Sequence, residues 1–252
     1  MTSKPLALTL AVAAAVALAA TFYVGARPVG MLPPLGALLD PAHGAWANAE
    51  DAVLRRTAMA DIPGLAGPVD VRYDARGVPH IFATTEEDAY RALGYVVARD
   101  RLFQLDIQTR AATGRLTELV GPVALDADET TRQLGMPRAA ELKFAALDPN
   151  GTSRRTMDAY AAGINAYIDG LPPADYPIEY KLLHVRPERW QAVNSIHLLN
   201  RMAYTLAAES PEQTLIHAAA VVGEKAAESV FPAHTPIEEP IQPVPGWTGP
   251  RN

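Results

Sequence analysis

The chain contains no cysteine among its 252 residues, so disulfide bonds, thiolate nucleophiles and thiolate metal sites are excluded outright. Histidine is scarce: six residues are scattered along the chain, and no His-x-x-x-His pair indicates a clustered metal site. The chain also lacks a Gly-x-Ser-x-Gly sequence, which argues against the nucleophile elbow of a Ser-His-Asp hydrolase.

Positive charge is also limited. The formal net charge is −6 and no long basic run is present, which argues against nucleic acid as the main partner. Proline, in contrast, is abundant at 22 residues, and it concentrates in residues 28–34 and 232–250. Both segments are therefore predicted to be linkers, and the length of the chain suggests one or two domains.

The N-terminus has the composition of a targeting segment. Residues 5–26 are uncharged and rich in Ala, Val and Leu, and Lys4 and Arg27 flank them. A cleaved signal peptide has an apolar core of about 7–15 residues and a membrane-spanning helix needs about 20, so residues 1–26 fit a signal peptide or a membrane anchor. Either alternative predicts export, to the periplasm or to the outer side of a membrane. Residues 27–66 are predicted to be a linker with a short helix.

Alternating apolar and polar residues predict a β-hairpin near residue 70. Residues 69–73 have the period of a half-buried strand, and residues 74–77 have the composition of a turn. Residues 80–83 are expected to form the second strand, which runs back along the first. Thr84 and Thr85, with Glu87 and Asp88 three residues on, then fit overlapping capping boxes, which predict the start of a helix that extends through Leu105.

Further helices are predicted from apolar periodicity and from capping residues. The apolar face of residues 157–168 is expected to need a partner outside this chain. Charged residues of the first helix, Arg99–Arg101 and Asp106, are interpreted as a solvated surface when taken alone. The four later helices are predicted over residues 138–147, 152–170, 190–206 and 211–222.

Three motifs follow one another between Val69 and Gly121: GVPHIFA, GYVVARDRLFQLD and TGRLTELVG. Together with YAAGINAYI at residues 160–168 and RPERW at residues 186–190, they resemble the α-subunit of the penicillin acylase family of N-terminal-nucleophile hydrolases. The resemblance implies an α/β (α+β) fold, in which this chain is the mostly helical N-terminal portion of a four-layer αββα sandwich. That fold would be incomplete without a β-subunit. Residues 67–230 are assigned to the acylase-like region and residues 231–252 to a proline-rich spacer.

The same resemblance implies a hydrolase that cleaves the amide bond of a small N-acyl compound, such as a β-lactam or an acyl-homoserine lactone. In this family a precursor cleaves itself and exposes a Ser at the start of the β-subunit, whose own α-amine acts as the base. Ser195, Ser210 and Ser229 of this chain lie in or beside predicted helices and lack the Ser-Asn-x-Trp context. No catalytic residue is therefore assigned here, and the chain alone is expected to be inactive.

Two substrate-binding residues follow from the resemblance. Met202 and Leu206 match positions where the family lines its acyl-group pocket. The alternative is that these two residues, one helical turn apart, belong to the core.

One metal ligand follows in the same way. Glu212 matches the Glu that the family's α-subunit gives to a structural Ca²⁺ site, although a shift of one residue would select Gln213. The alternative is that an acidic residue in the first turn of a helix is favoured by the helix dipole without any metal. No organic cofactor is implied.

A non-catalytic interpretation also remains open. A truncated acylase relic, or a binding or scaffold protein, would share the same motifs. A coding segment downstream of residue 252 that begins with Ser-Asn-x-Trp would favour the enzyme.

Overall fold

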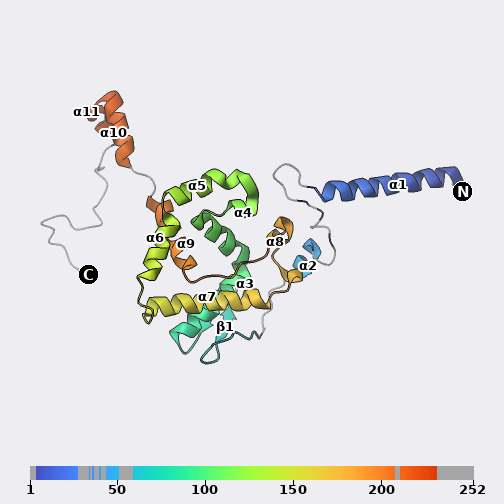
Figure 1. Cartoon of the computed structure of the whole chain (residues 1–252), viewed down its shortest axis with the longest axis horizontal. Coiled ribbons are helices and arrows are strands. Elements are labelled where there is room, and N and C mark those ends of the chain that lie inside the picture. The colour runs from blue at the N-terminus through green and yellow to red at the C-terminus, as the bar shows by residue number, and fades with distance from the viewer. Residues whose placement is uncertain are drawn as a thin grey trace. The chain divides into compact units, whose positions relative to one another are not determined.

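The computed structural model describes residues 4–27, 34, 36, 40, 44–50, 59–207 and 211–231. The chain divides into two compact units, one up to Met202 and one from Ala203 onward. Most of the described residues are helical (Figure 1), as the α+β prediction for a mostly helical portion requires.

The N-terminal part of the chain contains one long helix and one short helix. Helix α1 spans Lys4–Gly25, and α2 spans Ala45–Glu50 within the predicted linker. Among the described residues, Leu8–Gly25 is the one segment long and apolar enough to cross a membrane, a test that a signal sequence also passes. The choice between signal peptide and anchor stays open.

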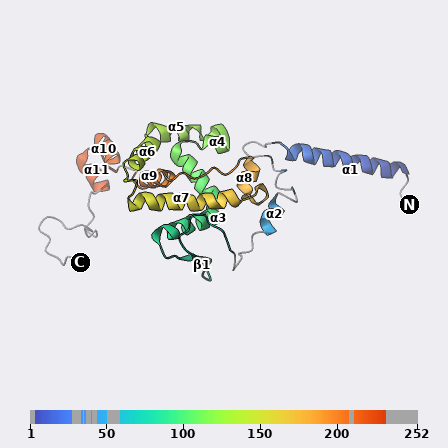
Figure 2. The same ribbon diagram turned by 60° about the horizontal axis from the view of Figure 1, so that its bottom comes forward.

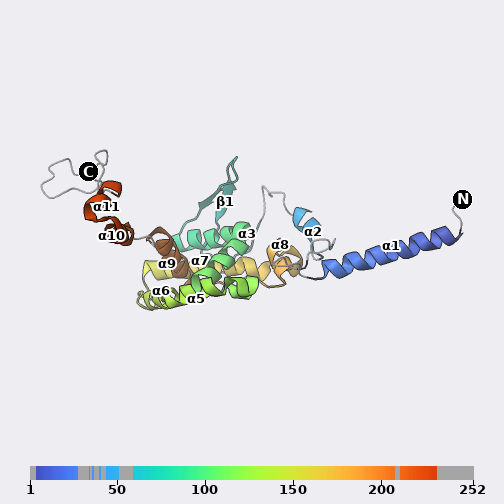
Figure 3. The same ribbon diagram turned by 90° about the horizontal axis from the view of Figure 1, so that it is seen from above.

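The predicted hairpin is confirmed. Strands β1 (Asp70–Tyr73) and β2 (Pro79–Phe82) pair antiparallel, with Val71 opposite Ile81. Gly77 closes the turn at φ +78°, a conformation that glycine adopts at little cost, and its N–H donates to Asp74 O at 3.0 Å. Figure 3 shows the hairpin projecting from the helices of its unit.

Helix α3 (Glu86–Thr113) starts at the predicted cap, where the Thr85 hydroxyl accepts a hydrogen bond from Asp88 N at 3.1 Å. It bends at Arg101, whose backbone is non-helical (φ −145°, ψ 27°). The remaining elements of the first unit follow in chain order: α4 (Thr117–Val120), the 3₁₀ turn η2 (Gly121–Ala124), α5 (Leu125–Gln133), α6 (Met136–Ala145), α7 (Thr152–Gly170), η3 (Pro173–Asp175) and α8 (Ile178–Leu183).

Helix α9 (Asn194–Ala207) reaches the end of the first unit, and α10 (Pro211–Val222) and α11 (Glu224–Val230) belong to the second. Helices α7 and α10 have the predicted boundaries, but the expected cap Ser210 lies outside the described residues. The prediction that α9 begins at Trp190 is wrong, because the helix starts at Asn194, four positions further along the chain.

Helices α3 and α7 pack against each other at very short range (Figures 1 and 2). Gly94 of α3 faces the backbone of α7, where an added Cβ would lie 2.1 Å from Tyr160 O. Gly163 of α7 faces α3 in turn, and its Cβ would lie 1.9 Å from Arg91 O. Two glycines therefore allow the backbones to come closer than any side chain would permit.

The core forms around this crossing. Ile164 and Tyr180 are almost fully buried, at 0% and 1% exposure, and the Tyr180 ring meets Phe103 edge to face at 5.2 Å between centroids. The buried members of the cluster are Ala98, Leu102, Ala161, Ile164, Tyr180 and Trp190. The expectation that the face of residues 157–168 needs an external partner is therefore wrong, because Ala161 and Ile164 in that face pack within this chain.

Candidate functional site

A buried ion pair on α3 is the starting point of the site. Asp106 and Arg110 lie one turn apart, and Arg110 Nε donates to Asp106 Oδ1 at 2.7 Å. Their side chains are only 9% and 6% exposed. The interpretation of Asp106 as a solvated helix charge is therefore wrong. The second half of α3, beyond the bend at Arg101, lies inside the protein.

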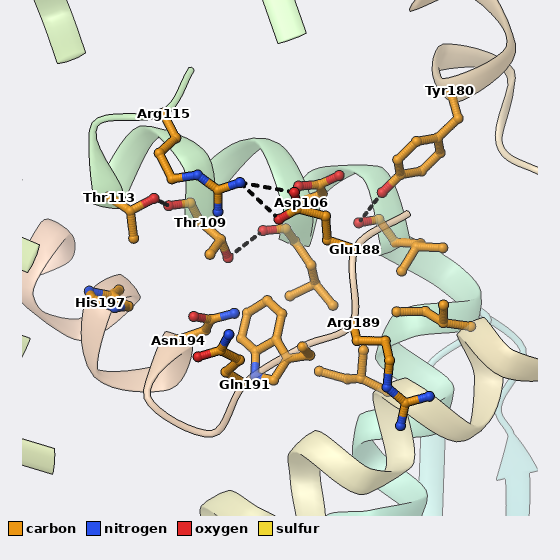
Figure 4. A pocket seen from close by; sticks show the side chains of 15 residues that line it. Asp106, Thr109, Thr113, Arg115, Tyr180, Glu188, Arg189, Gln191, Asn194 and His197 are labelled. Atoms are coloured by element: carbon orange, nitrogen blue, oxygen red, sulfur yellow. Dashed lines mark hydrogen bonds and ion pairs between the residues drawn. The ribbon is translucent and has the colours of Figure 1, made fainter. Parts of the chain in front are cut away.

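Arg110 also binds two carboxylates from other segments. One terminal nitrogen donates to Glu118 Oε2 of α4 at 2.5 Å, and the other lies 3.1 Å from Glu188 Oε1 in the segment before α9. Arg115 binds the same two residues, at 2.7 Å from Glu118 and 2.9 Å from Glu188, and Figure 4 shows its contact with Glu188. These five residues form what we call the Arg110 network, in which two guanidinium groups join three carboxylates.

The electrostatic environment differs within the network. Burial raises the pKa of Asp106, and the hydrogen bond and charge of Arg110 offset part of that rise. The pKa of Glu118, which is half exposed, is lowered chiefly by its hydrogen bond from Arg115. Burial and the neighbouring Asp106 raise the pKa of the Tyr180 hydroxyl, which donates to Leu102 O at 3.5 Å. Tyr180 therefore stays neutral, and Arg110 balances the buried carboxylate.

A second contact holds the segment that carries Glu188. Asn165 of α7 binds both backbone groups of Trp190: its Oδ1 accepts from Trp190 N at 2.7 Å, and its Nδ2 donates to Trp190 O at 2.9 Å. Because both groups are used in this way, Trp190 is held in an extended segment instead of starting a helix. This is the physical reason for the late start of α9.

A cavity of about 150 Å³ lies beside the network (Figure 4). Its wall includes Asp106 and Thr109 of α3, Glu188 and Trp190 of the extended segment, and His197 of α9. Burial lowers the pKa of His197, so its imidazole is neutral near pH 7. Four of the five motifs that carry the family resemblance therefore contribute residues to one polar cavity, and GVPHIFA at residues 77–83 does not.

The sequence-predicted site residues lie elsewhere. Met202 and Leu206 of α9 are 58% and 79% exposed and do not line this cavity. This exposure excludes the alternative that they are core residues of this chain. Their role in acyl binding stays a prediction.

Glu212 lies in the first turn of α10, as predicted, and is exposed. Within the described ranges, no group of three or more His, Cys, Asp or Glu side chains is placed to hold a metal ion. Ser195 is in α9, and the Ser229 hydroxyl donates to Ala226 O at 2.8 Å in α11, so both serines are inside helices. Ser210 lies outside the described residues.

Sequence reasoning missed the Arg110 network. The i, i+4 spacing of Asp106 and Arg110 is a signal for an ion pair, but the same spacing is common on exposed helix surfaces. Glu188 lies 78 positions after Arg110, and no pattern in the sequence connects the two residues.

Comparison with known proteins agrees with these motifs. The family model described as penicillin amidase matches residues 68–243, which is more than half of the chain. This chain belongs to the penicillin amidase family.

Several relatives support this assignment. Penicillin acylase 2 proenzyme of Pseudomonas sp. (strain SE83) is 45% identical over 141 residues, or 56% of this chain and 18% of the relative. The acyl-homoserine lactone acylase QuiP of Pseudomonas aeruginosa is 35% identical over 167 residues, or 65% of this chain and 19% of the relative. The chain thus spans about a fifth of the length of these relatives.

A solved structure matches the fold. The thermostable penicillin G acylase from Alcaligenes faecalis superimposes with a TM-score of 0.56 and 28% identity, covering 73% of this chain and 98% of the matched chain. The helical arrangement around α3 and α7 is therefore part of a known acylase architecture.

Proposed function

We propose that this chain is the α-subunit portion of an exported acylase that hydrolyses the amide bond of a small N-acyl compound. The observation that carries the proposal is the family match over residues 68–243, together with relatives described as acylases of penicillin and of acyl-homoserine lactone. The substrate class we propose is correspondingly broad: a β-lactam side chain, an acyl-homoserine lactone or a similar amide.

The catalytic nucleophile would come from a β-subunit. Its N-terminal Ser would attack the amide carbonyl while its own α-amine, with a pKa near 8, removes the hydroxyl proton. A hydroxyl inside a helix cannot replace this arrangement, because its residue has no free α-amine. The solved acylase chain is matched over 98% of its length, whereas the curated proenzyme is matched over 18%, which supports a separate chain for this region.

Exposed apolar side chains support a protein partner for the second unit. Ile216 and Val221 of α10 are 66% and 84% exposed, and Val230 of α11 is 66% exposed. We interpret this exposure of several large apolar side chains on α10 and α11 as part of an interaction surface. We propose the β-subunit of the same precursor as the partner.

Activity of separate and combined chains tests the proposal. Residues 27–252 alone should release no acid from N-acyl substrates above background, and co-expression with a β-subunit that begins with Ser should produce turnover. A downstream coding segment that begins with Ser-Asn-x-Trp would supply that subunit. Inactivity of the combined chains would favour the relic or scaffold alternative. Turnover by this chain alone, abolished by substitution of Ser195, Ser210 or Ser229, would contradict the proposed nucleophile.

Two finer assignments belong to the same proposal. Glu212 would give one carboxylate to Ca²⁺, so Glu212→Ala should lower the calcium content of the assembled protein more than Gln213→Ala. Unchanged calcium content in both variants would remove Glu212 from the site. Residues 5–26 would direct export or anchor the protein, and residues 1–40 should therefore activate a reporter that works only outside the cytoplasm. A silent but normally expressed reporter would contradict export.

A further inference from the structure

The cavity beside the Arg110 network contains buried polar atoms that no described residue satisfies. They are Asp106 Oδ2, Trp190 Nε1 and His197 Nδ1, and all three residues line the cavity. Trp190 and His197 are 7% and 5% exposed, and the Asp106 side chain is 9% exposed. The atoms come from three different segments: Asp106 is on α3 and His197 on α9 (Figure 4), and Trp190 is in the extended segment before α9.

The clustering of these atoms is informative. Buried polar atoms are nearly always hydrogen-bonded, because an unmade bond in the interior costs free energy. Five buried side-chain atoms in the described part of the chain have no partner, and three of the five line this one cavity. A shared occupant would satisfy all three, whereas three independent defects would not be expected to gather in one place.

The chemistry of the atoms defines the occupant. The Trp190 indole nitrogen only donates, an ionised Asp106 oxygen only accepts, and Nδ1 of a neutral histidine does one or the other according to its tautomer. The occupant must therefore both donate and accept hydrogen bonds. A metal ion cannot accept from the indole N–H, and an anion would be repelled by the carboxylate.

Size points to the same answer. A water molecule occupies about 30 Å³ in the liquid, so a cavity of about 150 Å³ has room for several. Buried waters characteristically make about three hydrogen bonds each to otherwise unsatisfied polar groups.

We propose that this cavity is a hydration site, in which a cluster of bound water molecules joins Asp106, Trp190 and His197. The waters connect α3 to the extended segment and to the first turns of α9. The cluster therefore fixes the start of the helix that carries Met202 and Leu206. Any effect of the water cluster on acyl binding, through the position of Met202 and Leu206, rests on the proposed function. The hydration site itself does not.

A high-resolution crystal structure of the protein made from the complete gene tests the site directly. Ordered waters should lie about 2.7–3.2 Å from at least two of the three atoms. A cavity without density, a side chain from another part of the precursor inside it, or a metal ion coordinated there would each overturn the proposal. None of these outcomes depends on acylase activity.

A stability measurement gives an independent test in solution. If water satisfies His197 Nδ1, His197→Leu removes hydrogen bonds and should lower the Tm by about 2–4 °C, the equivalent of about 1 kcal/mol. If the atom is dry and unsatisfied, the same change removes a penalty and should raise the Tm, which would contradict the proposal. Gln108→Leu on α3 is the control, because Gln108 is exposed, lies in the same unit and does not line the cavity, so the change should leave the Tm unchanged.

An NMR measurement on the Trp190 indole N–H tests the proposal if the His197→Leu variant does not fold. In protein labelled with ¹⁵N-tryptophan, the Trp190 N–H should show cross-relaxation with a long-lived water, and Trp190→Phe assigns the signal. Absence of that water contact in the folded protein would overturn the proposal.

Discussion

The first unit buries apolar residues around a crossing of two helices, whereas most of the apolar residues that the structure describes in the second unit are exposed. In the first unit Ile164 is 0% exposed and Arg110, at its centre, is 5% exposed. In the second unit Ala227 is buried, but Val221 and Leu206 are 84% and 79% exposed. The first unit therefore has an interior of its own, while the described residues of the second unit leave large apolar side chains exposed.

This difference separates two kinds of residue. Substitutions inside the first unit should change the free energy of unfolding, because its core cluster and the Asp106–Arg110 ion pair are buried. Substitutions in the second unit should change assembly or substrate choice, and they should not change the free energy of unfolding of the first unit. The following predictions test that division in the protein made from the complete gene.

The largest effect is expected from Arg110→Met. This change leaves the Asp106 carboxylate buried without its partner and should lower the free energy of unfolding by about 3–5 kcal/mol in urea titrations. Replacing both residues, in Arg110→Met with Asp106→Leu, should recover part of the loss, because the unpaired charge is gone. Arg72→Met removes an exposed ion pair with Asp70 and should have no measurable effect. Equal losses for Arg110→Met and Arg72→Met would contradict a buried network.

Gly163→Ala should have the next largest effect. Its Cβ would lie 1.9 Å from a backbone oxygen of α3, so the helices must separate, at a cost of about 3 kcal/mol in the free energy of unfolding. Gly170→Ala, at the end of the same helix, is the control, because an added Cβ there meets nothing within 4 Å. If both alanine variants were equally stable, the close crossing of α3 and α7 would be disproved.

Leu206→Phe should change function without changing stability. If Leu206 lines the acyl pocket, the ratio of kcat/KM values for short and long acyl chains should shift about 10–200-fold, the equivalent of about 1–3 kcal/mol. The free energy of unfolding should stay the same, because Leu206 is 79% exposed in this chain. An unchanged substrate ratio would remove Leu206 from the pocket.

Asp128→Asn should have the smallest effect, and a pH-dependent one. Burial alone would raise the pKa of Asp128, but hydrogen bonds from the Thr117 hydroxyl, Thr117 N and Leu116 N lower it overall. The unfolded chain therefore binds the proton more readily, and the stability that Asp128 contributes is full above pH 4 and lost as the pH falls further.

Thermal unfolding between pH 7 and pH 2 measures this effect. At pH 7 the Asn variant should be about 1–2 kcal/mol less stable than the wild type, and the difference should disappear in acid. Glu129→Gln, an exposed position on the same helix, should show neither effect. A constant difference at every pH would show that the carboxylate charge of Asp128 is not responsible.

Local patterns predicted much of the fold. The Asp74–Gly77 turn, the Thr85 cap and the full extent of α7 follow from residues within a few positions of one another. Such features depend on backbone conformation and short-range hydrogen bonds, which the sequence specifies directly. The start of α9 was mispredicted because Asn165, 25 positions before Trp190, decides the backbone there.

The sequence by itself determined the family, through motifs whose order and spacing are specific, and it determined the hairpin and the boundaries of α7 and α10. Only the tertiary structure decided that Asp106 is buried, that Gly94 and Gly163 each face the backbone of the other helix, and that Glu118 and Glu188 share Arg110. The physical reason is that burial and ion pairing depend on neighbours in space, and these neighbours are up to 78 positions apart in the chain.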